Sequence, residues 1–264
     1  MSEGDLRQSL ERIKSPRILV VGDLMLDYYS WGKVDRISPE APIPVMRVLQ
    51  EDRRLGGAGN VVMNLTTLGA EVFVCGVTGK DETGEYILKL LAENGVDHSG
   101  VITSENYKSC LKHRIIAGQN HLLRMDIDPD PEKLVPQKQL TDYLEQTIPK
   151  SHAVIVSDYG KGLLSTEILK TIAACGKKHG VPIVGDPRRT TNYCIYQDFT
   201  LIKPNRKETE AAVGFALKNQ NDVLKAAEQL KAEINVEYLV ISLDRDGLLP
   251  VSYTHLTLPT TPYV

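Results

Sequence analysis

Residues 153–186, AVIVSDYGKGLLSTEILKTIAACGKKHGVPIVGD, decide the fold class of this chain. The stretch begins with an apolar run ending in Ser-Asp, Ala153–Asp158, and closes with a second run, Pro182–Asp186. Between them, Thr166–Lys178 carries apolar side chains at helical spacing. A strand, a helix and a second strand in this order predict two parallel strands joined by a crossover helix.

The same alternation continues on both sides of this unit. We expect further strands at Arg17–Asp23, Glu71–Val77, Leu201–Lys203 and Tyr238–Leu243. We expect further helices at Gly57–Gly69, Asp81–Gly95, Asn205–Val213 and Asp222–Ala232. The predicted fold class is therefore α/β, with a mostly parallel central sheet and helices on both of its faces.

Two segments have a different pattern. Ser109–Asp126 holds two alternating runs around Gly118-Gln119-Asn120, which is typical of a β-hairpin. Ile43–Leu49 (IPVMRVL) is another alternating run. We expect these segments to form a small separate β-sheet inserted into the α/β core.

The composition excludes several classes of protein. The 264 residues include 31 Lys and Arg and 34 Asp and Glu, a net charge of -3, which argues against a nucleic-acid partner. No apolar run is long enough for a membrane span, and the polar N-terminus is unlike a signal peptide. The cysteines form no CxxC pair, which favours reduced thiols in a cytoplasmic protein.

Four polar segments follow predicted strands or open predicted helices, and in a parallel sheet the strand ends face one crevice. The first is Gly22–Asp27 (GDLMLD), which we expect to be a loop just past a strand. Asp23 and Asp27 can accept hydrogen bonds from neighbouring sugar hydroxyls. The alternative is purely structural: Asp23 ends the strand and Asp27 caps a turn.

The second segment is Gly56–Asn60 (GGAGN), at the start of a predicted helix. Its glycines let backbone amides approach a ligand closely, and Asn60 adds a neutral donor and acceptor. It matches neither a Walker A loop nor a GxGxxG loop. A tight turn with close helix packing explains it equally well.

The third and fourth segments carry groups suited to phosphate. Lys161, in Ser157–Gly162 (SDYGKG), is a mobile cation between glycines; the alternative is a surface lysine in a turn. In Lys203–Glu208 (KPNRKE), Asn205 and Glu208 can form a helix capping box. They can equally reach nucleotide phosphates and the water around Mg²⁺.

In this order and spacing, the segments resemble the PfkB (ribokinase-type) family of sugar kinases. The resemblance covers about Arg17 to Leu248 and is most specific at Arg36–Val45 (RISPEAPIPV) and at SDYGKG. Those two strings, together with GDLMLD, look like the heptose 7-phosphate kinases of this family.

The resemblance implies a ribokinase-like fold with a β-sheet lid, built from about residues 31–49 and 109–126, and a sugar held between lid and core. It implies transfer of the γ-phosphoryl group of ATP, with Mg²⁺, to the C1 hydroxyl of D-glycero-D-manno-heptose 7-phosphate in lipopolysaccharide precursor synthesis. It also implies a homodimer formed through the lid.

The resemblance also assigns residues to ligands. The sugar would be bound by Asp23, Asp27, Gly56, Gly57 and Asn60, and phosphate groups by Lys161 and Arg188. The nucleotide would be bordered by Asn205, Glu208, Ser242, Asp244 and Gly247. Glu208 would also reach the metal through water.

One family element is absent from these 264 residues. PfkB kinases carry a Gly-Ala-Gly-Asp segment whose amides form an anion hole and whose Asp is the general base, and no such segment occurs here. We therefore assign no catalytic residue and expect this chain to be inactive, because losing the base costs ~10²–10⁴-fold. We expect residues 1–249 to form an incomplete kinase domain and residues 250–264, which include an adapter-like VSYTHL, to be a non-native tail.

Two alternatives stay open at this point. Another PfkB kinase, acting on fructose phosphate, ribose or a nucleoside, would have the same loops and would differ in the lid. A non-catalytic sugar- or nucleotide-binding protein would also lack the Gly-Ala-Gly-Asp segment. An NAD-dependent oxidoreductase is disfavoured, because no GxGxxG motif is present.

Overall fold

The strand–helix–strand unit predicted at residues 153–186 is present in the computed structural model, which describes residues 15–130 and 135–252. Its strands β8 and β9 pair in parallel across the helix α5. The Ser165 hydroxyl accepts the Ile168 N–H at 3.2 Å, and Gly180 ends the helix with φ 66°. The three elements are β8 (Ala153–Ser157), α5 (Thr166–His179) and β9 (Ile183–Asp186).

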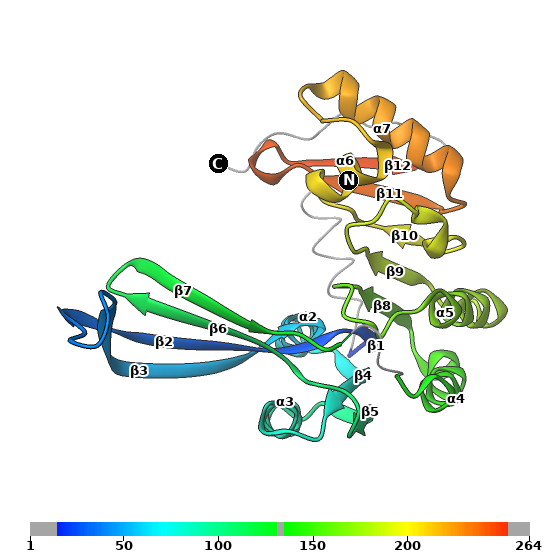
Figure 1. The fold of residues 1–264 in the computed structure, drawn as a ribbon. Coiled ribbons are helices and arrows are strands. Elements are labelled where there is room, and N and C mark those ends of the chain that lie inside the picture. Colours follow the sequence, from blue (N-terminus) through cyan, green and yellow to red (C-terminus); the bar gives the residue numbers. More distant parts are fainter. Residues whose placement is uncertain (1–14, 131–134, 253–264) are drawn as a thin grey trace.

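The central sheet has eight strands in the order β12-β11-β10-β9-β8-β1-β4-β5 (Figure 1). All neighbours pair in parallel except β11 and β12. The carboxyl ends of the parallel strands therefore lie along one edge. The remaining strands are β1 (Arg17–Gly22), β4 (Glu71–Gly79), β5 (Asp97–Ser104), β10 (Leu201–Ile202), β11 (Tyr238–Ser242) and β12 (Leu248–Ser252).

Helices cover both faces of this sheet, as predicted. Apolar side chains of α2 and α3 pack on one face of β1 and β4, and those of α4 and α5 belong to the cluster on the other face. Helix α7 packs against β11 further along the sheet. The helices are α2 (Ala58–Thr67), α3 (Glu82–Glu93), α4 (Gln137–Thr147), α6 (Arg206–Val213) and α7 (Gln220–Glu233). Three short 3-10 helices are η1 (Ile148–Lys150), η2 (Tyr193–Tyr196) and η3 (Asp244–Asp246). No helix within the described ranges is long and apolar enough to cross a membrane.

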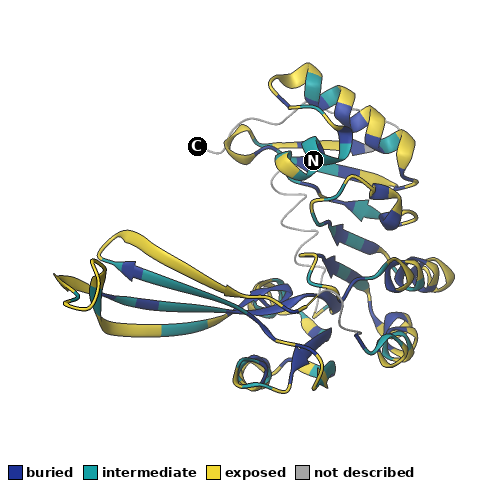
Figure 2. Ribbon diagram, viewed as in Figure 1, coloured by how far each residue is buried: buried dark blue, intermediate teal, exposed yellow. Residues whose placement is uncertain are grey.

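The predicted second sheet is a long four-stranded lid that projects from the core, in the order β3-β2-β6-β7 (Figure 1). The predicted hairpin is β6 and β7, which pair in antiparallel fashion around Gly118. Most lid residues beyond the root are exposed or half-buried (Figure 2). The lid strands are β2 (Leu24–Ile37), β3 (Pro44–Gly57), β6 (Cys110–Ala117) and β7 (Asn120–Ile127).

The prediction that Gly22–Asp27 forms a loop is wrong. Strand β2 begins at Leu24, so Asp23 is the one residue between the core strand β1 and the lid strand β2. Asp27 lies inside β2, where its carboxylate forms an ion pair with Arg114 of the neighbouring strand β6. That pairing compensates the charge within the sheet, which the sequence of a single strand does not reveal.

Candidate active site

Backbone hydrogen bonds bring the predicted segments together at one edge of the sheet. Each bond joins residues at or just past the carboxyl ends of neighbouring strands: Asp23 N to Ser157 O (3.3 Å), Asp158 N to Asp186 O (3.0 Å), Lys203 N to Gly185 O (2.9 Å) and Ser242 N to Pro204 O (2.9 Å). The segments that hold Asp23, Lys161, Arg188 and Asn205 therefore follow one another along this edge.

Asp23 lies at the junction of core and lid and is 1% exposed. Its Oδ2 accepts the N–H groups of Tyr159 (2.9 Å) and Lys161 (3.1 Å), while Oδ1 is buried without a hydrogen-bond partner among the described residues. Burial raises the pKa of this carboxyl to about 6, and the nearby charge of Asp158 acts in the same direction. Asp23 therefore holds the loop of Lys161 in place.

The Asp27 carboxylate lies close against the backbone of Gly56 in the paired strand β3. A Cβ added at Gly56 would overlap the Asp27 carboxylate, so a glycine is required for this close approach. The side chain of Asp27 is only 21% exposed and pairs with Arg114. A carboxylate fixed in this way can accept hydrogen bonds from hydroxyl groups of a ligand at the root of the lid.

Gly57 and Asn60 belong to the start of α2. Gly57 is the N-cap with φ 57°, a conformation that favours glycine, and its neighbour Ala58 donates its N–H to Asp23 O at 3.0 Å. Asn60 is exposed in the first turn and lines a cavity of about 310 Å³ with the lid residues Arg53 and Arg54. Within the described parts of the chain, Asn60 makes no hydrogen bond to the other predicted site residues.

Lys161 makes an ion pair between core and lid root. Its Nζ lies 2.6 Å from Oδ2 of Asp128, and the Cys110 thiol donates to Oδ1 of the same carboxylate at 3.2 Å. Partial burial acts to raise the pKa of Asp128, but the bonds from Lys161 and Cys110 and the charge of Lys112 outweigh it, so that this pKa lies below its ordinary value.

Arg188 follows β9 and lies against the loop of Lys161. Its Nη1 donates to Oδ2 of Asp158 and to the Leu164 carbonyl, both at 3.2 Å. Its side chain is 31% exposed, whereas that of Asp158 is completely buried. A cation held by buried acceptors and open to solvent on one side is suited to an anionic ligand.

Asn205 and Glu208 form the capping box of α6. The Asn205 side chain accepts the Glu208 N–H at 3.0 Å, and Oε2 of Glu208 accepts the Asn205 N–H at 2.8 Å. Burial raises the pKa of Glu208, and the charge of Asp186 adds to the effect while Lys203 opposes it. The structural alternative for this pair is therefore present, and it leaves a carboxyl with a raised pKa at the strand edge.

The last three predicted residues follow β11. Ser242 makes a β-bridge with Asn205, which places it beside the α6 cap. Asp244 has φ 54° and accepts Arg206 Nε at 3.3 Å, and Gly247 has φ 92° at the turn into β12. Arg206 thus links this turn to α6.

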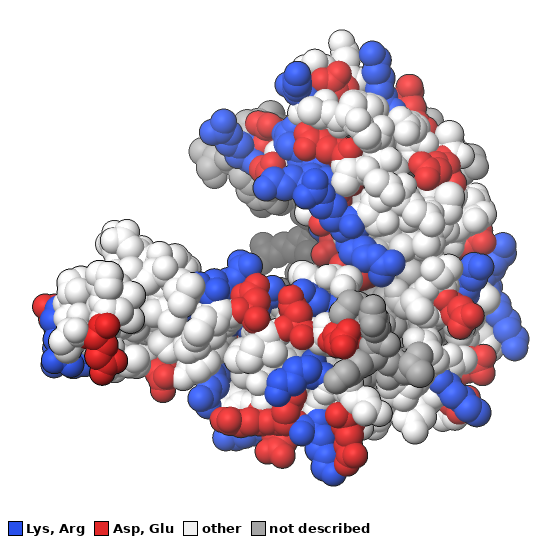
Figure 3. All heavy atoms as spheres, viewed as in Figure 1, with Lys and Arg blue, Asp and Glu red and all other residues white. Residues whose placement is uncertain are grey.

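Sequence reasoning missed a set of cations on the lid. The strand register places these cations on the same face of the lid as Asp27. At the root of the lid, the ion pair between Asp128 and Lys161 connects the lid to the strand edge of the core. The set comprises Arg54, Lys112, Arg114 and Arg124. Figure 3 shows charged side chains gathered beside the hollow between lid and core. The alternation in residues 109–126 was the signal that could have found them.

No cluster of three or more His, Cys, Asp or Glu side chains suited to a metal occurs in the described residues. A Mg²⁺ ion usually takes only one or two protein carboxylates beside phosphate oxygens. At this edge of the sheet the available carboxylates are Glu208, which caps α6, and Asp186, which forms an ion pair with Lys203 at 3.0 Å.

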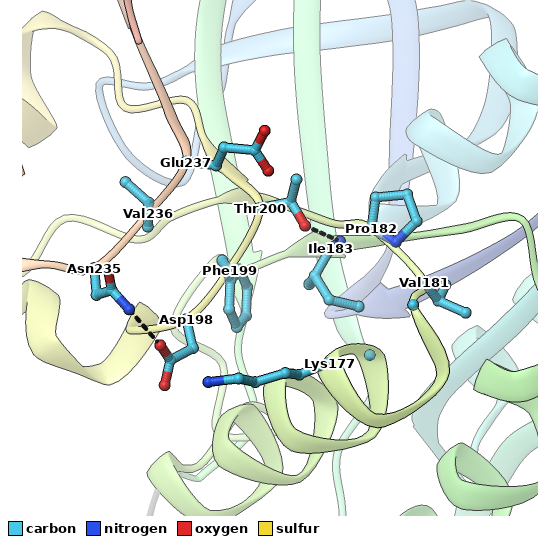
Figure 4. A pocket seen from close by; sticks show the side chains of 12 residues that line it. Lys177, Val181, Pro182, Ile183, Asp198, Phe199, Thr200, Asn235, Val236 and Glu237 are labelled. Atoms are coloured by element: carbon cyan, nitrogen blue, oxygen red, sulfur yellow. Dashed lines mark hydrogen bonds between the residues drawn. The ribbon is translucent and has the colours of Figure 1, made fainter. Parts of the chain in front are cut away.

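A cavity of about 460 Å³ lies at the opposite edge of the sheet, between the end of α5 and the starts of β9 to β11 (Figure 4). There Asn235 Nδ2 donates to Asp198 at 2.8 Å, and Thr200 Oγ1 accepts the Ile183 N–H at 3.0 Å. None of the predicted site residues lines this cavity.

The fold and the site together define an α/β protein built to hold a small polar ligand, because the polar ends of a mostly parallel sheet lie beside a projecting β-lid that carries charged side chains. The pfkB family carbohydrate kinase profile matches residues 15–262. This chain belongs to that family.

The relatives agree with this assignment. The chain is 38% identical over 249 residues to "Bifunctional protein HldE" of Geotalea uraniireducens, covering 94% of the chain and 51% of that protein. It is 40% identical over 235 residues to the protein of the same name from Campylobacter curvus, covering 89% and 50%. The chain therefore spans about half the length of the curated relatives it matches.

Solved structures confirm the fold. Arabidopsis thaliana ribokinase complexed with ribose and ATP matches with a TM-score of 0.71 at 15% identity, over 94% of this chain and 78% of that one. Phosphofructokinase-2 from Escherichia coli, in complex with substrates and products, matches with a TM-score of 0.71 at 21% identity, over 94% and 80%.

Proposed function

We propose that this chain carries the sugar-kinase part of a heptose 7-phosphate 1-kinase. In this reaction the γ-phosphoryl group of ATP passes to the C1 hydroxyl of D-glycero-D-manno-heptose 7-phosphate. The observation that carries the proposal is the juxtaposition of a hydroxyl acceptor, Asp27, with the lid cations Lys112 and Arg114, on a lid face that reaches Lys161 through Asp128. A phosphorylated sugar needs both kinds of group.

The sugar-binding residues divide between lid and core. Asp27 with Gly56, and the helix start at Gly57 and Asn60, would bind hydroxyl groups, while Lys161 and Arg188 on the core and Lys112 and Arg114 on the lid would bind phosphate. Asp23 would act through the loop of Lys161, because its Oδ2 is occupied by two amides of that loop.

The nucleotide would lie further along the strand edge, bordered by Ser242, Asp244 and Gly247. Asn205 would bind its phosphates. Mg²⁺ supplies charge neutralisation on the phosphates when it is bound, and Glu208 would hold it through water.

Phosphoryl transfer needs a general base in addition to the binding groups described above. They contain no Gly-Ala-Gly-Asp segment, and we expect binding of both ligands but turnover ~10²–10⁴-fold below that of a kinase with the general base. Of the segment 250–264 proposed as a non-native tail, residues 250–252 belong to β12 and the rest lies outside the described residues.

The lid would also pair two copies of the chain. On its second face, β7 presents Leu123, Met125 and Ile127, which are 53%, 43% and 41% exposed. Such a row of exposed apolar side chains is typical of a surface that another protein covers.

Calorimetric titration of the chain with heptose 7-phosphate, fructose 6-phosphate, ribose and adenosine tests the substrate. We expect heptose 7-phosphate to bind at least about tenfold more tightly than the others, a difference of about 1.4 kcal/mol. Tightest binding of ribose or adenosine would favour another PfkB activity instead.

Substitutions on the lid test whether its cations bind the phosphate group of heptose 7-phosphate. Lys112→Ala and Arg114→Ala should each weaken heptose 7-phosphate binding about tenfold, because each removes a charge-assisted bond. Lys138→Ala removes an exposed lysine that pairs with Asp142 on α4 and should change nothing. Unchanged affinity in both lid variants would contradict the proposal.

A further inference from the structure

A buried carboxylate lies behind Arg188. The Asp158 side chain is completely buried, and both of its oxygens are used. Oδ1 accepts the Gly160 N–H at 2.9 Å, and Oδ2 accepts Arg188 Nη1 at 3.2 Å and the Tyr196 hydroxyl at 2.7 Å. A buried ion pair is retained when its remaining hydrogen bonds are satisfied, and Tyr196 satisfies one of them.

Tyr196 contacts Arg188 a second time. The Arg188 N–H donates to the Tyr196 hydroxyl at 3.1 Å, so this one hydroxyl touches both the backbone of Arg188 and the carboxylate that holds its guanidinium. The Tyr196 ring itself is fixed in the core, packed edge-on against Tyr193 and Phe199 with centroids 5.8 Å and 5.9 Å away. Its position therefore follows the core and not the ligand.

The guanidinium is anchored on one side only. Nη1 carries both of its bonds, to Asp158 and to the Leu164 carbonyl, while the side chain stays 31% exposed. Gly160, with φ 68°, lies against the Arg188 side chain, so that the loop leading to Lys161 touches the same group. An arginine whose rotamer is fixed in advance loses less entropy when it binds an anion.

We propose that Tyr196 is a positioning residue that, through Asp158, aims Arg188 at the phosphate group of the substrate. This inference rests on the proposed function, in which Arg188 binds that phosphate. Tyr196 is fully buried, so it would act on the phosphate only through Arg188. Its contribution is to phosphate recognition and not to the sugar hydroxyls.

The chain offers a matched control. Tyr193 lies in the same 3-10 helix, is equally buried and packs against Tyr196, but its hydroxyl has no hydrogen-bond partner among the described residues. Tyr193→Phe and Tyr196→Phe are thus the same chemical change at neighbouring buried sites, and only the second removes bonds to Asp158 and Arg188.

The experiment compares Tyr196→Phe, Tyr193→Phe and Arg188→Ala. Calorimetry measures the Kd of each for heptose 7-phosphate and for the same heptose without its phosphate. We expect Tyr196→Phe to weaken heptose 7-phosphate about tenfold and Arg188→Ala at least as much, since a bond to a charged group is lost. The unphosphorylated heptose should bind all variants equally, and Tyr193→Phe should match the unaltered chain.

The outcomes separate the two proposals. If Arg188→Ala leaves heptose 7-phosphate binding unchanged, the assignment of Arg188 in the proposed function fails, and this inference with it. If Arg188→Ala weakens binding but Tyr196→Phe behaves like Tyr193→Phe, or weakens both ligands alike, this inference alone fails. Should Tyr196→Phe not fold, Asp158→Asn takes its place: a loss confined to heptose 7-phosphate supports the inference, and unchanged affinity overturns it.

Discussion

Asp23 is the residue at which sequence and structure differ most in chemical detail. Its position after a predicted strand suggested a hydroxyl acceptor, and the structure engages one of its oxygens with two loop amides. The sequence predicted that Asp23 lies at a strand end, but it could not predict which groups donate hydrogen bonds to it, because Tyr159 and Lys161 are far away along the chain. The two alternatives for Asn205, by contrast, included the capping box that is present.

The raised pKa of Asp23 has a consequence for stability. The folded chain binds the proton more tightly than the unfolded chain, about 6 against 3.8, so this group stabilises the fold most below pH 4 and loses that contribution as the pH rises through 6. The loss is about 3 kcal/mol. Asp23→Asn should abolish it.

Urea unfolding at pH 4, 5, 6 and 7 checks this. Between pH 4 and pH 7, the free energy of unfolding of Asp23→Asn should rise by about 2 kcal/mol relative to that of the unaltered chain, because pH 4 still lies slightly above the unfolded pKa of 3.8. Asp142→Asn, on the exposed side of α4, serves as the control and should show no such gain. A pH-independent difference for Asp23→Asn would rule the argument out.

Among the elements, those with strong periodicity were predicted and those without it were missed. Helix α4 (QKQLTDYLEQT) buries Leu140, Leu144 and Thr147 in a polar sequence, and β5 (DHSGVITS) has few apolar residues. Tertiary packing makes these elements, so their own sequences carry little signal. The length of β2 escaped prediction for a related reason, because Arg114 compensates Asp27 from another strand.

The cap of α6 allows its two roles to be separated. Asn205→Ser keeps a side-chain cap for the Glu208 N–H and should leave stability within about 0.5 kcal/mol, whereas Asn205→Ala should cost about 1 kcal/mol. If Asn205 also binds nucleotide phosphate, the Ser variant should bind ATP several-fold more weakly. Thermal unfolding and ATP titration measure the two effects.

The N-cap of α7 provides the comparison. Asn219 accepts the Asp222 N–H at 3.1 Å in the same role, and Asn219→Ser should leave ATP affinity as it was. An Asn205→Ser chain that binds ATP normally would reduce Asn205 to a structural cap.

At the scale of the whole molecule, the class of fold, the two sheets and the shared strand edge all followed from the sequence. The side of the lid that faces the core did not, because it depends on the register among β2, β3 and β6. That register decides which residues join Asp27, and a shift by one position would exchange the two faces. This is why the lid cations became visible only in three dimensions.

The apolar row on β7 predicts a dimer through the lid. Leu123→Asp should convert the chain to monomers, because it places a charge in the buried centre of the contact. Leu68→Asp is the control: Leu68 is 81% exposed at the end of α2, outside the lid, and its substitution should leave the dimer intact.

Sedimentation equilibrium distinguishes the two variants. A monomeric unaltered chain, or a Leu123→Asp chain that still dimerises, would remove the lid as the assembly surface.

The covalent route from β1 to β2 through Asp23 alone also gives the molecule a mechanical character. Strand β1 lies in the interior of the sheet between β8 and β4, and it runs into a lid strand of 14 residues without a flexible spacer. Because β3 passes directly into α2 at Gly57, tension applied at the far tip of the lid would load the centre of the core sheet and the start of α2 together. A movement of the lid is therefore transmitted directly to the core sheet through Asp23, and inserting residues at this junction would uncouple the lid from the core.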